Sequence, residues 1–158
     1  MDKRNGVNEP SRLSRGKIFQ ALVQKDFRQN THDGTAHAEA RLSFERLPHL
    51  RQKFGRADIL ITDLGGFVTV LEIKATDWDK IEPANVKRNL YRHQRQLFMY
   101  VEKCLEVDKL DVCLGIIYPH PPRKPGLRSS VENHLESQYG VPAYWYSEIR
   151  TGAPKQDA

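Results

Sequence analysis

The chain has 158 residues, of which 39% are hydrophobic and 28% charged, and its 25 Lys and Arg against 20 Asp and Glu give a formal net charge of +5. This composition excludes a disordered or fibrous chain and is sufficient for one domain with its own core. No stretch is apolar enough to span a membrane, and the first 16 residues contain no apolar signal segment, so a cytoplasmic protein with no membrane contact is expected. The positive charge permits a polyanionic partner without requiring one.

Residues 1–14 and 151–158 are polar and contain Pro and Gly, which predicts a flexible N-terminus and a flexible tail around a single domain of residues 15–150. Residues 14–30 have the periodicity of an amphipathic helix. Its apolar stripe is expected to contain Ile18, Phe19, Leu22, Val23 and Phe27.

Residues 35–48 contain small or apolar side chains at every second position from Ala36 to Phe44, which favours a strand. The next segment predicts a β-hairpin, with a strand over residues 57–62, a turn over residues 63–66 and a second strand over residues 67–74. The Gly65-Gly66 pair suits such a turn because glycine readily adopts positive φ.

The second half of the chain predicts two helices and two strands. A long helix begins at Pro83 or Ala84 and ends near Leu105. The apolar run over residues 111–119 suits a central strand covered on both faces. Residues 127–139 form a further amphipathic helix ended by Gly140, and residues 141–149 form a short aromatic strand. Most of the buried side of the long helix is expected to consist of Val86, Leu90, Leu97, Val101 and Cys104.

A carboxylate and an ammonium stand close together at the end of the second hairpin strand. Period-two alternation places Leu71 and Ile73 on one face of that strand and Glu72 and Lys74 on the other. Taken alone, such a pair is most simply an ion pair at a strand end. However, antiparallel pairing brings the start of one hairpin strand beside the end of the next, so Asp58 is expected to converge with Glu72 and Lys74.

Two neighbouring carboxylates repel one another unless a positive charge lies between them. A hard divalent cation such as Mg²⁺ binds oxygen ligands, and Asp58, Glu72 and the backbone carbonyl of Ile73 offer such ligands. A cation in this position lowers the pKa of bound water and offsets charge on a phosphodiester, while Lys74 orients the attacking water.

Asp58 followed by Glu72-Ile73-Lys74 resembles the bipartite signature of the PD-(D/E)XK nuclease superfamily. Ala57 stands where that signature often has proline. The resemblance implies an α/β, restriction-endonuclease-like fold with an αβββαβ core, a mixed central sheet flanked by helices, and agrees with the predicted element order.

A second motif lies on the long helix. Gln96 and Tyr100 match the Gln-x-x-x-Tyr motif of the RecB-like and lambda-exonuclease-like branch. Positions four apart share a helix face, so Arg88, Arg92, Gln96 and Tyr100 form one ridge. The resemblance implies that Gln96 and Tyr100 position the substrate or Lys74 and that Arg88 and Arg92 contact the DNA backbone; a solvated face has the same pattern.

Related enzymes often carry a further acidic residue upstream of this site. The polar flank of the first helix offers Lys17, Gln20 and Gln24 instead. Glu39 is therefore the tentative additional metal ligand, and Glu45 is the second candidate.

The sequence thus predicts a Mg²⁺- or Mn²⁺-dependent nuclease acting on DNA. Alternatives are an inactive nuclease fold that binds nucleic acid or protein, an RNA-cleaving toxin-type nuclease, and an unrelated α/β domain with a surface ion pair. No reader motif is present, so any specificity is expected to come from loops, a homodimer or a protein partner. All six histidines are expected to be surface or backbone-bonded, Asp77 and Asp79 to organise a turn, and Trp78 to pack under it.

Overall fold

The computed structural model describes residues 12–30, 34–38, 58–63, 68–108 and 112–151. The elements in chain order are α1 (Arg12–Asn30), β1 (Gly34–Ala38), β2 (Ile59–Asp63), β3 (Val68–Ile73), η2 (Trp78–Lys80), α2 (Pro83–Asp108), β4 (Val112–Tyr118), α3 (Leu127–Tyr139), β5 (Ala143–Trp145) and α4 (Tyr146–Thr151).

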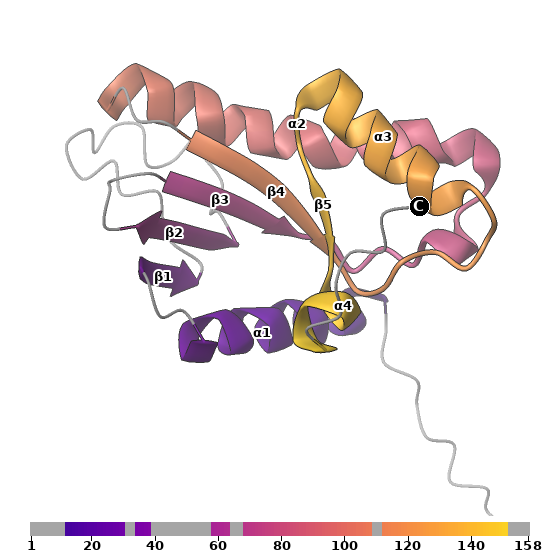
Figure 1. Cartoon of the computed structure of the whole chain (residues 1–158), viewed down its shortest axis with the longest axis horizontal. Coiled ribbons are helices and arrows are strands. Elements are labelled where there is room, and N and C mark those ends of the chain that lie inside the picture. The colour runs from indigo at the N-terminus through magenta and orange to yellow at the C-terminus, as the bar shows by residue number, and fades with distance from the viewer. Residues whose placement is uncertain (1–11, 31–33, 39–57, 64–67, 109–111, 152–158) are drawn as a thin grey trace, which may run out of the picture.

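One five-stranded sheet forms the centre of the molecule, with the strands in chain order from β1 to β5. The pairs β1–β2 and β2–β3 are antiparallel, whereas β3–β4 and β4–β5 are parallel. The helix α1 covers one face of this sheet, while α2 and α3 lie on the other (Figure 1). The predicted α/β class, with a mixed sheet flanked by helices and the order αβββαβ, is confirmed.

Alternation along β3 supplies a core on each side of the sheet. Leu71 and Ile73 join Val23 of α1 in one buried cluster. Val70 joins Leu90 and Leu97 of α2 in the other cluster. The predicted separation of the two faces of this strand is therefore confirmed, and Val86, Leu90 and Leu97 are buried as expected. The side chains of Val101 and Cys104 lie outside the described residues.

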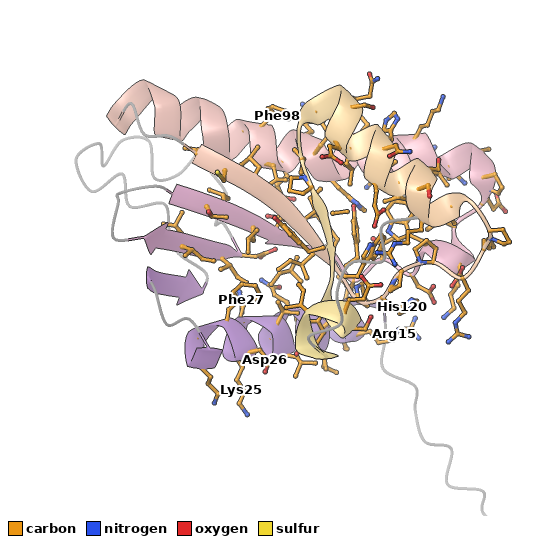
Figure 2. The ribbon with its side chains drawn as sticks, viewed as in Figure 1. Arg15, Lys25, Asp26, Phe27, Phe98 and His120 are labelled. Carbon is orange, nitrogen blue, oxygen red and sulfur yellow. The ribbon has the colours of Figure 1, made fainter. Side chains whose placement is uncertain are left out.

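The predicted apolar stripe of α1 is partly wrong. Phe19, Val23 and Phe27 pack against the sheet, but Ile18 is 61% exposed and Leu22 is 39% exposed. Phe27 points from α1 towards the sheet, whereas Lys25 points away from it (Figure 2). The helix is rotated in this way because Gln20 and Gln24, on the flank of the Phe19–Phe27 row, contact Asp58.

The C-terminal prediction of a strand over residues 141–149 is also partly wrong. Only Ala143–Trp145 are extended, and Tyr146–Thr151 form the short helix α4. The extended segment ends because Tyr146 packs edge-to-face on Phe19 of α1 and Glu148 pairs with Arg128 of α3. These two contacts lie on opposite layers of the molecule.

The boundaries of α2, β4 and α3 agree with the sequence to within a few residues, whereas the end of the strand predicted within residues 35–48 lies outside the described residues. The helix α3 ends at Gly140, whose φ of 62° is the left-handed conformation expected for a C-terminal cap. The helix α1 begins at Arg12, inside the segment predicted to be flexible, and Tyr146–Thr151 reach the predicted tail. The Gly65-Gly66 turn, Glu39 and Glu45 lie outside the described residues. In the described part of the chain, no helix is long and apolar enough to cross a membrane.

Candidate active site

The β2–β3 hairpin places Asp58 beside the end of β3. Ile59, the first residue of β2, pairs with Leu71, so Asp58 just before β2 stands next to Glu72 just after Leu71. Asp58 Oδ2 accepts a hydrogen bond from the backbone N–H of Ile73 at 2.8 Å. This bond fixes one oxygen of the carboxylate against the strand that carries Glu72.

The first helix holds the other side of Asp58. Gln20 Nε2 donates to Asp58 Oδ1 at 2.7 Å, and Gln24 Nε2 donates to the Asp58 backbone carbonyl at 3.0 Å. Gln24 is 4% exposed. Two amides of α1, one turn apart, therefore hold Asp58, Gln20 through the carboxylate and Gln24 through the backbone carbonyl, a role that the sequence did not reveal because glutamine in a helix has no distinctive pattern.

Lys74 lies between the strand and α2. Its Nζ donates to Glu72 Oε1 at 2.7 Å and to Gln96 Oε1 at 2.8 Å. Gln96 lies on α2, whereas Lys74 follows β3. This contact therefore joins the Glu-x-Lys motif to the Gln-x-x-x-Tyr motif. The structure thus brings together Asp58, Glu72, Lys74 and Gln96, which the sequence analysis selected.

Glu72 is the most deeply buried side chain of this site, since it is only 2% exposed. Burial raises the pKa of Glu72 to about 7, the adjacent Lys74 ammonium offsets part of that rise, and the nearby Asp58 carboxylate adds to it. Glu72 Oε2 is buried without a hydrogen-bond partner. A buried carboxylate oxygen that lacks a donor is a suitable ligand for a cation.

The structure describes the side chains of only some of the other predicted site residues. Arg88 and Arg92 lie on the exposed side of α2. Tyr100 belongs to α2, but its side chain lies outside the described residues, as does Glu39. Among the described residues, no group of three or more His, Cys, Asp and Glu side chains forms a metal-binding cluster, so Asp58 and Glu72 stand there as a pair.

The prediction that every histidine is surface or backbone-bonded is wrong for His93. Its Nδ1 lies 3.0 Å from the Tyr118 hydroxyl, and its ring contacts those of Trp78 and Tyr118. Burial, together with the nearby Lys74 and Arg92 charges, lowers the pKa of His93 to about 3. A neutral imidazole therefore lies near Lys74, three residues before Gln96.

The segment after β3 is organised by its two aspartates, as predicted. Asp77 caps η2 by accepting from the Asp79 N–H at 3.2 Å. Asp79 accepts from the backbone N–H of Arg123 at 2.9 Å and from that of Lys124 at 3.2 Å. Trp78 is fully buried, which confirms its packing role. Asp79 therefore attaches the β4–α3 loop to η2, the turn that follows β3.

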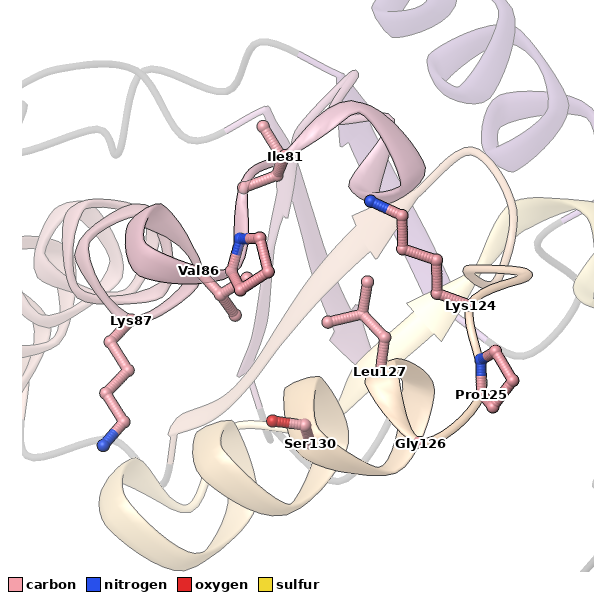
Figure 3. A pocket seen from close by; sticks show the side chains of 9 residues that line it. Ile81, Val86, Lys87, Lys124, Pro125, Gly126, Leu127 and Ser130 are labelled. Carbon is pink, nitrogen blue, oxygen red and sulfur yellow. The ribbon is translucent and has the colours of Figure 1, made fainter.

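A separate cavity of about 360 Å³ lies between the first turns of α2 and α3 (Figure 3). Its walls are mostly apolar, and the charged side chains that line it are those of Lys87 and Lys124. None of the site residues Asp58, Glu72, Lys74 and Gln96 lines it. The cavity and the carboxylate pair are therefore distinct features of the molecule.

No protein-family model matches the sequence, and no curated protein matches it. Among solved structures, the chain is similar to a repair endonuclease from Pyrococcus abyssi, with 16% sequence identity and a TM-score of 0.42. The alignment covers 80% of this chain and 46% of that one, so the chain spans less than half the length of that protein. This degree of similarity is too low to assign a function.

Proposed function

We propose that the chain is a divalent-metal-dependent nuclease that hydrolyses phosphodiester bonds of DNA. The observation that best supports this proposal is the arrangement of Lys74, whose Nζ contacts both Glu72 and Gln96 while Glu72 lies beside Asp58. A structural ion pair at a strand end requires only Glu72 and Lys74. The additional carboxylate offers a second oxygen ligand for a cation, and the amide fixes the Lys74 ammonium, neither of which an ion pair needs.

The donor set fits a hard cation. Asp58 and Glu72 supply two neighbouring carboxylates, and the buried Glu72 Oε2 has no hydrogen-bond partner. In this proposal Asp58, Glu72 and the Ile73 carbonyl hold Mg²⁺ or Mn²⁺, and Glu39 is the further ligand. The cation would supply charge neutralisation at the phosphate and a more acidic bound water.

The other groups assist from fixed positions. In this proposal Lys74, oriented by Glu72 and Gln96, directs the attacking water or stabilises the developing negative charge. Gln20 restricts the rotation of the Asp58 carboxylate, and Gln24 holds the Asp58 backbone carbonyl. Tyr100 positions the substrate with Gln96, while Arg88 and Arg92 bind backbone phosphates.

A cleavage assay tests this function. Wild-type protein and Glu72→Gln are incubated with linear, nicked, supercoiled and single-stranded DNA and with RNA, each with Mg²⁺, Mn²⁺ or EDTA. Cleavage of DNA that needs the cation and falls at least about a hundredfold in Glu72→Gln is expected. Glu82→Gln, at an exposed glutamate just before α2, is the matched control and should cleave like wild type.

Two results would contradict the proposal. One is cleavage that persists in EDTA, because the two carboxylates then have no cation to hold. The other is the absence of cleavage of every substrate by wild type, which would leave a nucleic-acid- or protein-binding module as the function. Cleavage of RNA alone would change the proposed substrate from DNA to RNA but would leave the proposed hydrolytic reaction as it is.

A further inference from the structure

The solvent side of α2 carries a second ridge beside the one that contains Gln96. Residues four apart on a helix are neighbours, so Lys87, Tyr91, Arg95 and Met99 form a row. All four side chains are exposed, with Tyr91 at 52% and Met99 at 45%. The opposite side of the helix, with Leu90 and Leu97, is buried against the sheet. This second ridge therefore faces water along its length.

The first and second ridges together are strongly basic. Between Pro83 and Met99 the helix carries four Lys and Arg residues and no Asp or Glu: Lys87, Arg88, Arg92 and Arg95. Within the described part of the chain, none of these four cations takes part in an ion pair. Arg88 and Arg95 are seven residues apart, which is about 10 Å along the helix axis. Such a surface favours a polyanion that extends along the helix.

The exposed ring of Tyr91 indicates whether that polyanion is a duplex or a single strand. In a duplex the bases are stacked on one another, and a basic helix meets phosphates and groove edges. An exposed aromatic ring among cations instead suits an unpaired base, because the ring stacks on the base while the cations contact the phosphates. Tyr91 follows Arg88 and precedes Arg92 and Arg95, so every turn beside it supplies a cation.

We propose that the row Lys87, Tyr91, Arg95 and Met99 binds a single-stranded segment of nucleic acid, with Tyr91 stacking on an unpaired base and Arg95 contacting a phosphate. Lys87 extends this surface to the wall of the cavity that α2 forms, while Lys124 lines the cavity from the loop before α3 (Figure 3). The first ridge, with Arg92 and Gln96, then connects the bound strand to Lys74. This inference rests on the proposed function, which makes a nucleic acid the substrate. Binding of the strand is nevertheless measured separately from its cleavage.

The test is a binding titration in EDTA, in which no cleavage is expected. A labelled oligothymidylate and a labelled duplex of the same length are titrated with wild type, Tyr91→Ala, Tyr91→Phe and Arg95→Ala. Tyr91→Ala is expected to weaken single-strand binding about five- to a hundredfold and to leave duplex binding within about twofold, whereas Tyr91→Phe retains single-strand binding. Arg95→Ala is expected to lower the slope of log affinity against log salt by about 0.7 on the single strand.

Lys25→Ala removes one exposed cation from α1, on the other face of the sheet, and is the matched charge control. It should bind like wild type. Circular dichroism checks the fold of each variant. All variants are expected to fold because Tyr91 and Arg95 are exposed.

The inference is overturned if Tyr91→Ala binds the single strand like wild type, if it weakens single-strand and duplex binding equally, or if wild type does not bind the single strand. Each of these results leaves the cleavage assay with Glu72→Gln unaffected. Conversely, a Tyr91-dependent single-strand affinity without any cleavage would support the surface and contradict the nuclease. The two proposals therefore fail separately.

Discussion

At the residue scale, Glu72 determines how the site responds to pH. Because its pKa is raised from 4.5 to about 7, the folded protein holds a proton that the unfolded chain releases between these values. Without a cation, the contribution of Glu72 to stability is therefore fully present below about pH 4.5 and is lost as pH rises through 7. In the proposed function a cation would replace that proton, so the apparent cation affinity should increase over the same range.

Glu72→Gln tests this directly. In EDTA the variant is expected to be more stable than wild type at pH 8, by roughly 1–3 kcal/mol, and close to wild type at pH 5, because glutamine carries no charge to bury. Urea unfolding at both pH values measures the difference. A stability difference that does not change with pH would show that the buried carboxylate is not protonated near neutrality.

Gln20 is a second residue whose effect is specific. Removal of its hydrogen bond to Asp58 Oδ1 in Gln20→Ala should reduce cleavage or cation affinity about 10–100-fold, the usual effect of losing a group that orients a metal ligand. Lys17→Ala, at an exposed position one turn earlier on α1, is the control. Calorimetry of Mn²⁺ binding checks the affinity without any substrate, and an unchanged affinity together with unchanged cleavage would exclude the role of Gln20.

At the element scale, Asp79 of η2 anchors the β4–α3 loop through two of its backbone N–H groups. Asp79→Ala leaves the backbone N–H groups of Arg123 and Lys124 without their acceptor. Because this part of the loop is exposed and water replaces the acceptor, the expected loss is about 1–2 kcal/mol of unfolding free energy. Thermal unfolding should show a decrease of roughly 2–8 °C, and Glu82→Ala provides the surface control.

Prediction from sequence succeeded for elements with strong local periodicity. The hairpin brings Asp58 to Glu72 because antiparallel pairing dictates it, and α2 places Gln96 on the ridge given by its four-residue spacing. It failed where a distant partner decides the local structure. The segment after Trp145 reads as a strand, yet Tyr146 meets Asp26 and Glu148 meets Arg128, and α4 forms instead. Gln20, Gln24 and His93 were missed for the same reason, since their partners are on other elements.

At the scale of the whole molecule, α4 connects the two layers on either side of the sheet. Tyr146 hydrogen-bonds to Asp26 of α1, and Glu148 accepts two hydrogen bonds from Arg128 of α3, at 2.7 and 3.1 Å. Glu148→Ala should therefore destabilise the protein by about 1–2 kcal/mol, since a bidentate, partly buried pair is lost. Glu136→Ala, at an exposed glutamate of α3, should be near neutral in the same urea titration. Equal effects of the two substitutions would show that α4 contributes no such connection.

The strand order of the sheet has a consequence for folding. Each strand pairs with its neighbours in the chain, so no strand has to insert between two that are already paired. The hydrogen bond from Ile73 to Asp58 spans 15 residues, that from Lys74 to Gln96 spans 22, and that from Gln20 to Asp58 spans 38. Because closing a longer loop costs more chain entropy, we expect the two carboxylates to meet first, then the lysine to find its amide, and the first helix to dock last. The site would thus assemble from its centre outwards, with the carboxylates of the hairpin together before the amides of α2 and α1 arrive.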